Sequence, residues 1–353
     1  MSKTGSHPTL ADVARKAGVG TTTVSRVING GNRVSPRTLN RVHSVIEQLG
    51  YMPNQAARIL KGERTKTIGL VIPSIADSFF SSCAEAAQEI ARANDSLLIV
   101  TVTNNDPHIE MENLNVLMRH RTDGLLLAPA NYQSESLGEF LGRISTPVVS
   151  FDRPVAKTDV PSVVADNYNG ARIAIEHLIG HGYKRILCLG GETTLYTIRE
   201  RLRGYRHAIE EAGLPTMIDM SVKDYKSAEY AIESNLAASQ PPDAIFTVKN
   251  STTIYAFEAL QKMKVPIPKS VALLGFDDFE LASTLRPSIS VIQQPVEDLG
   301  RIAAEILFEQ LFPTKKKKHQ LTKKRQDQVK LETRLVLRNS CGCNPAAMPE
   351  IIS

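Results

Sequence analysis

The 353-residue sequence lacks any run of about 20 consecutive apolar residues, the length that a membrane-spanning helix needs. No apolar run follows Met1, so we expect no membrane association and a cytoplasmic location. The four cysteines contain no CxxC pair and no spacing typical of a disulfide framework. Metal binding is one interpretation of Cys341-Gly342-Cys343, but a lone CxC near the chain end favours two plain thiols, and we expect neither a metal site nor a cofactor.

Motifs of common enzyme classes are also missing. The sequence has no GxxxxGK[ST] loop, no GxSxG and no HExxH, and Gly190-Gly191 alone is a weak phosphate signal. His177 and His181, on or just after an expected helix, are interpreted as surface or packing residues and not as a catalytic pair. We therefore do not expect an enzyme.

Positive charge is concentrated in two segments. Residues 1–67 hold 11 Lys and Arg against 3 Asp and Glu, a net charge of +8, and residues 314–330 carry +7. Because the whole chain is at +5, the remaining residues carry −10. This asymmetry predicts contact with a polyanion at the first segment. We interpret the second segment as a solvated loop, with an additional DNA or partner contact as the alternative.

The first basic segment has the pattern of three short helices. Thr9 and Asp12 have the spacing of a capping box, and Gly18 is placed to end the first helix. A tight turn leads into a second helix over residues 21–28, and Ser35-Pro36 begins a third that ends at Gly50. This is the spacing of a helix-turn-helix, whose second helix enters a major groove.

The second helix decides between DNA binding and a purely structural bundle. Val24, Val27 and Ile28 are spaced to face a small core. The other positions carry hydroxyl, amide and guanidinium groups suited to base edges and phosphates: Thr21, Thr22, Thr23, Ser25, Arg26 and Asn29. In a structural bundle, the threonines would only begin a helix and Arg26 would be a solvated charge. The net positive charge of the segment favours DNA binding.

Two strings in this region resemble the lactose/galactose repressor (LacI/GalR) family of bacterial transcription regulators. They are TLADVARKAGVGTTTVSRVING and LGYMPNQAARILKGERTKTIGLVIP, and the resemblance extends over nearly the whole chain, with a weaker fit in the last forty residues. It implies a dimer on a pseudo-palindromic operator DNA. We expect Thr21, Thr22 and Arg26 to read bases, and the DNA backbone to be held mainly by Thr9, Thr23, Ser25, Asn29 and Arg33.

A linker is expected over residues 53–66. Asn54 is placed to cap a helix that ends near Leu60, and two helical turns alone are marginal in water. The family resemblance implies a hinge helix that folds against its dimer mate in the minor groove, with Ala57 at the pair interface and Leu60 as a wedge between base pairs. The alternative is a plain flexible linker, which the apolar Ile59 and Leu60 make less attractive.

From Thr67 onward, short apolar strands alternate with amphipathic helical segments, which indicates doubly wound α/β sheets. The strands are too many for one compact sheet, so we expect two. The expected strands are 68–73, 97–103, 124–130, 147–151, 185–191, 244–248 and 271–278, and the expected helices are 79–93, 107–120, 168–179, 199–212, 228–238 and 251–263.

The sequence and the resemblance together predict a multidomain chain. A small all-α helix-turn-helix domain covers residues 1–52, and the hinge covers 53–66. An α/β core like periplasmic binding proteins covers 67–340, followed by a tail over 341–353. Its expected subdomains are residues 67–165 with 296–326, and residues 166–293 with 328–340.

Polar residues follow the apolar runs PVVSF, SVVA, AIFTV and VALLGF, at the strand ends where ligands of doubly wound folds bind. These residues are Asp152, Asp166-Asn167, Lys249-Asn250 and Asp277-Asp278. Each carboxylate is either a ligand contact or a cap for the next helix. The resemblance implies that Arg201 and Asp277 are main effector contacts, and that Phe79, Phe80, Asp152, Thr197 and Tyr225 are secondary ones.

One departure from the resembled family concerns the effector. Lys249-Asn250 stands where the family usually has Asn-Asp, so an ammonium replaces an amide. With Arg201, this ammonium suggests a ligand with a carboxylate or phosphate, and we expect a sugar, a sugar acid or a phosphosugar. Two alternatives remain: a small-molecule-binding protein without a DNA role, and a regulator whose core binds a partner protein.

Overall fold

The computed structural model describes residues 8–28, 30, 34–52, 64–313 and 328–343. They divide between two compact units, Met1–Thr65 and Lys66–Ser353, each of which is described by itself. In the described part of the chain, no helix is both long and apolar enough to cross a membrane. The central residues of the expected hinge, 53–63, lie outside the described residues.

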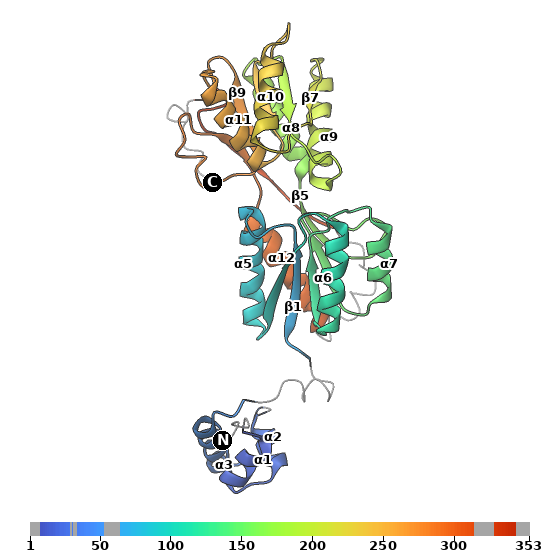
Figure 1. Ribbon diagram of the computed structural model, residues 1–353, viewed down its shortest axis with the longest axis vertical. Coiled ribbons are helices and arrows are strands. Elements are labelled where there is room, and N and C mark those ends of the chain that lie inside the picture. Colours follow the sequence, from blue (N-terminus) through green and yellow to red (C-terminus); the bar gives the residue numbers. More distant parts are fainter. Residues whose placement is uncertain (1–7, 29, 31–33, 53–63, 314–327, 344–353) are drawn as a thin grey trace, which may run out of the picture. The chain divides into compact units, whose positions relative to one another are not determined.

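The described residues of the first unit form three helices, α1 (Leu10–Ala17), α2 (Thr21–Ile28) and α3 (Pro36–Leu49), drawn in blue in Figure 1. The capping box before α1 is present: the Asp12 amide donates to the Thr9 hydroxyl, and the Thr9 amide donates to the Asp12 carboxylate. Gly18 and Gly50 end α1 and α3 with φ angles of 64° and 60°, in the left-handed region that glycine adopts without strain.

One small core joins these three helices. Val13 of α1, Val24 of α2 and Val42 of α3 are each fully buried in it. Tyr51, just after α3, packs against the same cluster. The apolar faces of the three helices therefore pack against one another, and the polar face of α2 lies at the surface.

The second unit is built on two six-stranded sheets. The first has the order β11-β5-β4-β3-β1-β2, with all neighbours parallel. The second has the order β12-β10-β9-β8-β6-β7, and only its edge strand β12 is antiparallel. The strands of the first sheet are β1 (Thr67–Ile72), β2 (Leu97–Val102), β3 (Gly124–Leu127), β4 (Val148–Phe151), β5 (Ser162–Ala165) and β11 (Gln328–Leu331). Those of the second are β6 (Ile186–Leu189), β7 (Met217–Asp219), β8 (Ala244–Thr247), β9 (Ala272–Phe276), β10 (Ser290–Gln293) and β12 (Arg334–Val336).

Helices cover both faces of each sheet, which is why most strands are buried apolar runs and do not alternate. On the first sheet, α5 and α12 share one core and α6 and α7 the other (Figure 1). On the second sheet, α8 and α9 share one core and α10 and α11 the other. The helices are α5 (Ser78–Ala93), α6 (Pro107–Arg119), α7 (Glu135–Arg143), α8 (Asn167–Gly180), α9 (Tyr196–Glu211), α10 (Tyr225–Leu236), α11 (Asn250–Lys262) and α12 (Val296–Leu311).

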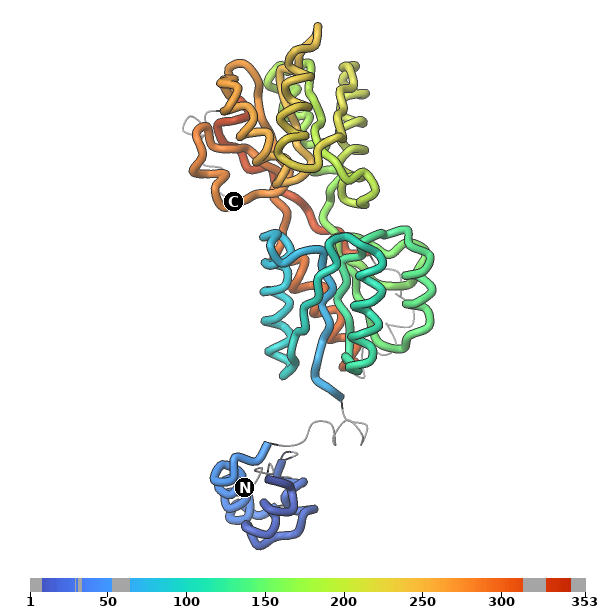
Figure 2. The backbone as a smooth tube through the Cα atoms, in the orientation of Figure 1, coloured from blue at the N-terminus to red at the C-terminus, as the bar shows by residue number. Residues whose placement is uncertain are grey.

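The chain passes between the two sheets three times: after β5, after β10 and after β11 (Figure 2). The prediction that residues 328–340 belong wholly to the second subdomain is wrong, because Gln328–Leu331 pairs with Ser162–Ala165 of the first sheet. This edge strand is short and half polar, so its sequence does not show which sheet it joins. The expected tail from residue 341 is also wrong at its start, because Cys341 and Cys343 are buried in the core of the second sheet.

Candidate functional site

A cavity of about 220 Å³ lies at the carboxyl ends of the strands, between the two sheets of the second unit. β4 leads directly into Asp152 and β9 into Asp277, so the parallel strands deliver both carboxylates to this cavity. Seven of the eight predicted effector residues line it: Phe79, Phe80, Asp152, Thr197, Arg201, Lys249 and Asp277.

Arg201 of α9 is the centre of a buried hydrogen-bond network. Its guanidinium donates to the Asn167 side chain at 2.7 Å, to the Val248 carbonyl at 2.7 Å and to the Asp277 carboxylate at 3.1 Å. The guanidinium also lies over the Phe276 ring, 3.7 Å from its centre. The Arg201 side chain is only 4% exposed. Burial of an unpaired charge is strongly unfavourable, and these hydrogen-bond and charge partners offset that cost.

A second buried ion pair lines the same cavity. Arg153 donates to the Asp152 carboxylate at 3.0 Å and to the Asn105 side chain at 2.7 Å. Burial raises the pKa of Asp152, and the nearby Asp277 carboxylate adds to this, whereas the positive charges of Arg153 and Arg201 oppose it.

Asp152 and Asp277 both have positive φ angles, 62° and 73°. For a residue with a side chain this backbone conformation is uncommon, and it persists only where the surroundings hold it. Strain of this kind, at two carboxylates in one cavity, is typical of a ligand-binding site.

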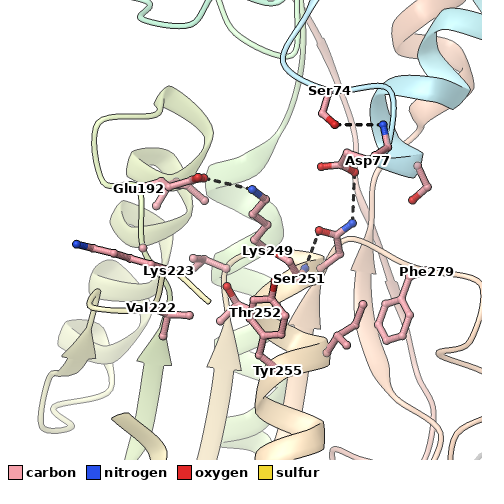
Figure 3. Close-up of a pocket in the computed structure, with 17 residues that line it drawn as sticks. Ser74, Asp77, Glu192, Val222, Lys223, Lys249, Ser251, Thr252, Tyr255 and Phe279 are labelled. Carbon is pink, nitrogen blue, oxygen red and sulfur yellow. Dashed lines mark hydrogen bonds and ion pairs between the residues drawn. The ribbon is translucent and has the colours of Figure 1, made fainter. Parts of the chain in front are cut away.

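A larger cavity of about 570 Å³ adjoins the first, and the two share Ser74, Asp77, Ile198 and Lys249. In Figure 3 the Lys249 ammonium points to Glu192 and donates to its carboxylate at 3.2 Å. The Asn250 amide donates to Asp77, 3.5 Å away, and so links α11 on the second sheet to the start of α5 on the first. The two cavities form one cleft with hydrogen-bonding groups on both sides.

One predicted residue lies elsewhere, and several residues that line the smaller cavity were not predicted. Tyr225, at the start of α10, lines neither cavity, and its ring instead lies 5.9 Å from the Lys262 ammonium. The sequence reasoning missed Asn105, Arg153 and Gln294, which line the smaller cavity. Gln294 donates to Asp277 at 2.5 Å and follows β10, a strand that the sequence did not reveal.

The DNA-reading side chains predicted on α2 lie at its surface. Thr21, Thr22 and Arg26 are exposed, and Thr23 and Ser25 are partly exposed. Thr9 is exposed as well, although its hydroxyl is engaged in the cap of α1. The remaining predicted contacts lie outside the described residues: Asn29, Arg33, Asn54, Ala57 and Leu60.

The structure also brings together four residues that the sequence reasoning treated separately. His177 and His181, at the end of α8, lie against Cys341 and Cys343. The histidines lie 162 to 166 positions before the cysteines that they contact, so no local sequence pattern reveals the cluster.

Known proteins share both parts of this architecture. Residues 9–54 match the family described as bacterial regulatory proteins, lacI family, and residues 175–341 match the periplasmic binding protein-like domain. The ribose operon repressor of Haemophilus influenzae is 32% identical over 306 residues, which cover 86% of this chain and 92% of that protein. The chain belongs to the lacI family of bacterial regulatory proteins. This confirms the family resemblance and the expectation of a DNA-binding transcription regulator that is not an enzyme.

Solved structures agree with the fold of this lacI-family regulator. The lac repressor dimer bound to operator and the anti-inducer ONPF has a TM-score of 0.83 at 23% identity, over 95% of this chain and 99% of that one. The complex of the transcriptional regulator CelR with cellobiose has a TM-score of 0.69 at 28% identity, over 94% and 99% of the two chains. The predicted fold class, a helix-turn-helix domain and a core of two α/β subdomains, is confirmed.

Proposed function

We propose that this lacI-family regulator is a repressor that binds a pseudo-palindromic operator as a dimer, and that a carbohydrate in the cleft controls its affinity for DNA. We infer the class of effector from the side chain of Gln294. Its side-chain oxygen is buried in the cleft without a hydrogen-bond partner among the described residues, while its nitrogen donates to Asp277. A buried acceptor left unpaired costs about 1–3 kcal/mol, and a ligand hydroxyl that donates to it would recover that energy.

The charges of the cleft favour a neutral, hydroxyl-rich ligand. Arg153 is paired with Asp152, Arg201 with Asp277, and Lys249 with Glu192. An incoming anion would have to compete with a carboxylate for each of these cations. Hydroxyl groups donate and accept at once, and so match such paired sites without displacing either partner. The names of the relatives, a ribose operon repressor and a regulator bound to cellobiose, point to the same class of ligand.

A sugar acid or phosphosugar remains the second candidate, because the pair of Lys249 with Glu192 is the weakest of the three. Their side chains are 32% and 49% exposed, and ion pairs at the surface stabilise little, so an anion can displace Glu192 at small cost.

The experiment is a thermal-shift screen of neutral sugars, sugar acids and phosphosugars, followed by calorimetric titration of the best ligand into wild type, Glu192→Gln and Gln294→Leu. For a neutral sugar we expect Gln294→Leu to weaken binding and Glu192→Gln to leave it unchanged. An anionic ligand would instead bind Glu192→Gln more tightly, because Lys249 is then unpaired. If no carbohydrate of any class shifts the melting temperature, the proposed effector class is wrong.

The DNA side of the proposal rests on α2. Arg26 is exposed and forms no ion pair with the described residues, so its guanidinium is available for a base edge or a phosphate. We expect Arg26→Ala to cost about 1–3 kcal/mol on DNA selected from a random pool, and much less on unselected DNA at the same salt concentration.

The matched control is Arg41→Ala, which removes an exposed arginine of α3 outside the reading helix. If Arg41 contacts a phosphate, Arg41→Ala should weaken binding to selected and unselected DNA equally. If Arg41 makes no DNA contact, the substitution should leave both affinities unchanged. Equal losses of Arg26→Ala on selected and unselected DNA would remove Arg26 from the base-reading residues.

A further inference from the structure

We propose that His177, His181, Cys341 and Cys343 form a structural zinc site in the second subdomain of the core, apart from the effector cleft. Among the described residues, the donor atoms of His177, His181 and Cys343 all lie within 4.8 Å of one another. The Cys341 sulfur lies 3.3 Å from Nε2 of His177 and brings the number of donors to four.

The distances between these donors match a tetrahedral metal site. Nε2 of His181 lies 3.1 Å from the Cys343 sulfur, and Nε2 of His177 lies 3.5 Å from it. In a tetrahedral zinc site the nitrogen and sulfur ligands are about 3.5 Å apart, because Zn–S bonds are about 2.3 Å and Zn–N bonds about 2.0 Å. The three nitrogen–sulfur distances, 3.1, 3.3 and 3.5 Å, are therefore close to the spacing that a zinc ion imposes on such a pair of ligands.

The local chain explains how each pair of ligands is presented. His177 lies in the last turn of α8 and His181 is its C-cap residue, so the two imidazoles are four residues apart and project from one face. Their rings lie 4.7 Å apart, centre to centre. On the other side, Gly342 turns the chain between the two cysteines with a φ of 97°, and a Cβ there would lie 2.9 Å from the Tyr183 hydroxyl. Glycine therefore permits both the turn and the close approach.

Hydrogen bonds to the neighbouring strands hold the segment that carries the cysteines. The Ser340 hydroxyl donates to the Leu273 carbonyl at 2.5 Å and accepts from the Ser290 amide at 2.8 Å. The Ser290 hydroxyl donates to the Cys341 sulfur at 3.1 Å, which is the kind of supporting hydrogen bond that orients a thiolate ligand. The two thiols are buried in the core, so they are shielded from solvent.

The chemistry of the ligands selects zinc. Two thiolates and two imidazoles in a tetrahedron are a structural zinc set, whereas calcium and magnesium require oxygen ligands. A structural zinc ion is complete with four ligands and needs no open coordination position. The ion would therefore connect the segment after β12 to the end of α8. Helix α8 begins at Asn167, a partner of Arg201 in the cleft, and His177 lies about 15 Å further along the helix axis. The two sites are therefore separate.

The test uses the full-length, tag-free protein purified under reducing conditions, with metal content measured by mass spectrometry. We expect about one zinc ion per chain in wild type and in two controls, Cys83→Ala and His108→Ala, whose residues lie outside the cluster. His181→Ala and Cys343→Ser should lose the ion. Because His181 is exposed, its substitution should leave the fold intact, which circular dichroism checks.

Two further measurements identify the ligands. Co²⁺ added to metal-free wild type should give the strong visible bands of a tetrahedral site and a sulfur-to-cobalt charge-transfer band, and both should disappear in Cys343→Ser. A chelator should lower the melting temperature of wild type and leave that of His181→Ala unchanged. The proposal is overturned if wild type neither retains nor binds zinc, or if the variants retain it.

Discussion

Glu110, in the first turn of α6, makes the stability of the core depend on pH. Only 1% of it is exposed; one carboxylate oxygen accepts a hydrogen bond from the Ala130 amide at 2.6 Å, and the other is buried without a partner among the described residues. Burial raises the pKa of Glu110 from 4.5 to about 7, although the Ala130 amide and the positive charge of Arg153 act in the opposite direction.

A carboxyl group with a raised pKa in the folded state stabilises the fold at low pH. Below a pH of about 4.5 both states hold the proton, and this contribution is fully present. Between about 4.5 and about 7 only the folded state holds it, so stability falls as the pH rises and then levels off. A difference of about 2.5 pKa units corresponds to about 3 kcal/mol in total.

Glu110→Gln removes this titration and keeps an oxygen that can accept from Ala130. We expect wild type to lose about 2–3 kcal/mol of stability relative to Glu110→Gln between about pH 5 and about pH 8, measured by urea denaturation of the α/β core. Groups that titrate in both proteins, such as Asp152, cancel in this difference. Glu112→Gln, on the exposed side of the same helix, is the control and should follow wild type. If Glu110→Gln and wild type lose stability in parallel, the buried carboxyl is not the cause.

Two further predictions concern the core and the hinge. Tyr205→Phe should destabilise the second subdomain by about 1–3 kcal/mol in denaturant titrations. The reason is that the buried Tyr205 hydroxyl donates to the Ile186 carbonyl at 2.8 Å and accepts from the Met217 amide at 3.0 Å. An unchanged unfolding midpoint would mean that water replaces these hydrogen bonds in the variant. Leu60→Ala should reduce operator affinity and DNA bending together, as loss of a minor-groove wedge would, and unchanged bending in a gel-shift assay with permuted sites would refute the wedge.

Local signals explain which parts of the fold the sequence predicted. The capping pair Thr9 and Asp12, and the glycines that end α1 and α3, act within one helical turn, so their sequence pattern is enough. The seven expected strands are all present because buried parallel strands are continuous apolar runs. The short strands β7, β10, β11 and β12 were missed, because what makes them strands is pairing with other strands of the sheet.

The same distinction applies to the cleft. Asp152 and Asp277 were predicted because they directly follow apolar strands, whose carboxyl ends meet at one edge, and because the family resemblance implies an effector contact at both. Gln294 was missed because it follows β10, which was itself missed, and Arg153 was missed because its role depends on burial beside Asp152. The anionic effector was predicted from Lys249 together with Arg201, and no local pattern shows that Glu192, 57 residues before Lys249, pairs with its ammonium.

In the proposed mechanism, ligand binding in the cleft decides when α2 binds DNA. The most direct test is fluorescence anisotropy of wild type on selected DNA, at one salt concentration, with and without the carbohydrate found in the screen. We predict that a saturating ligand changes the DNA dissociation constant by about 5- to 150-fold, and that saturating DNA changes the affinity for the ligand by the same factor. If a ligand binds the cleft and leaves the DNA dissociation constant unchanged, the cleft does not control DNA binding.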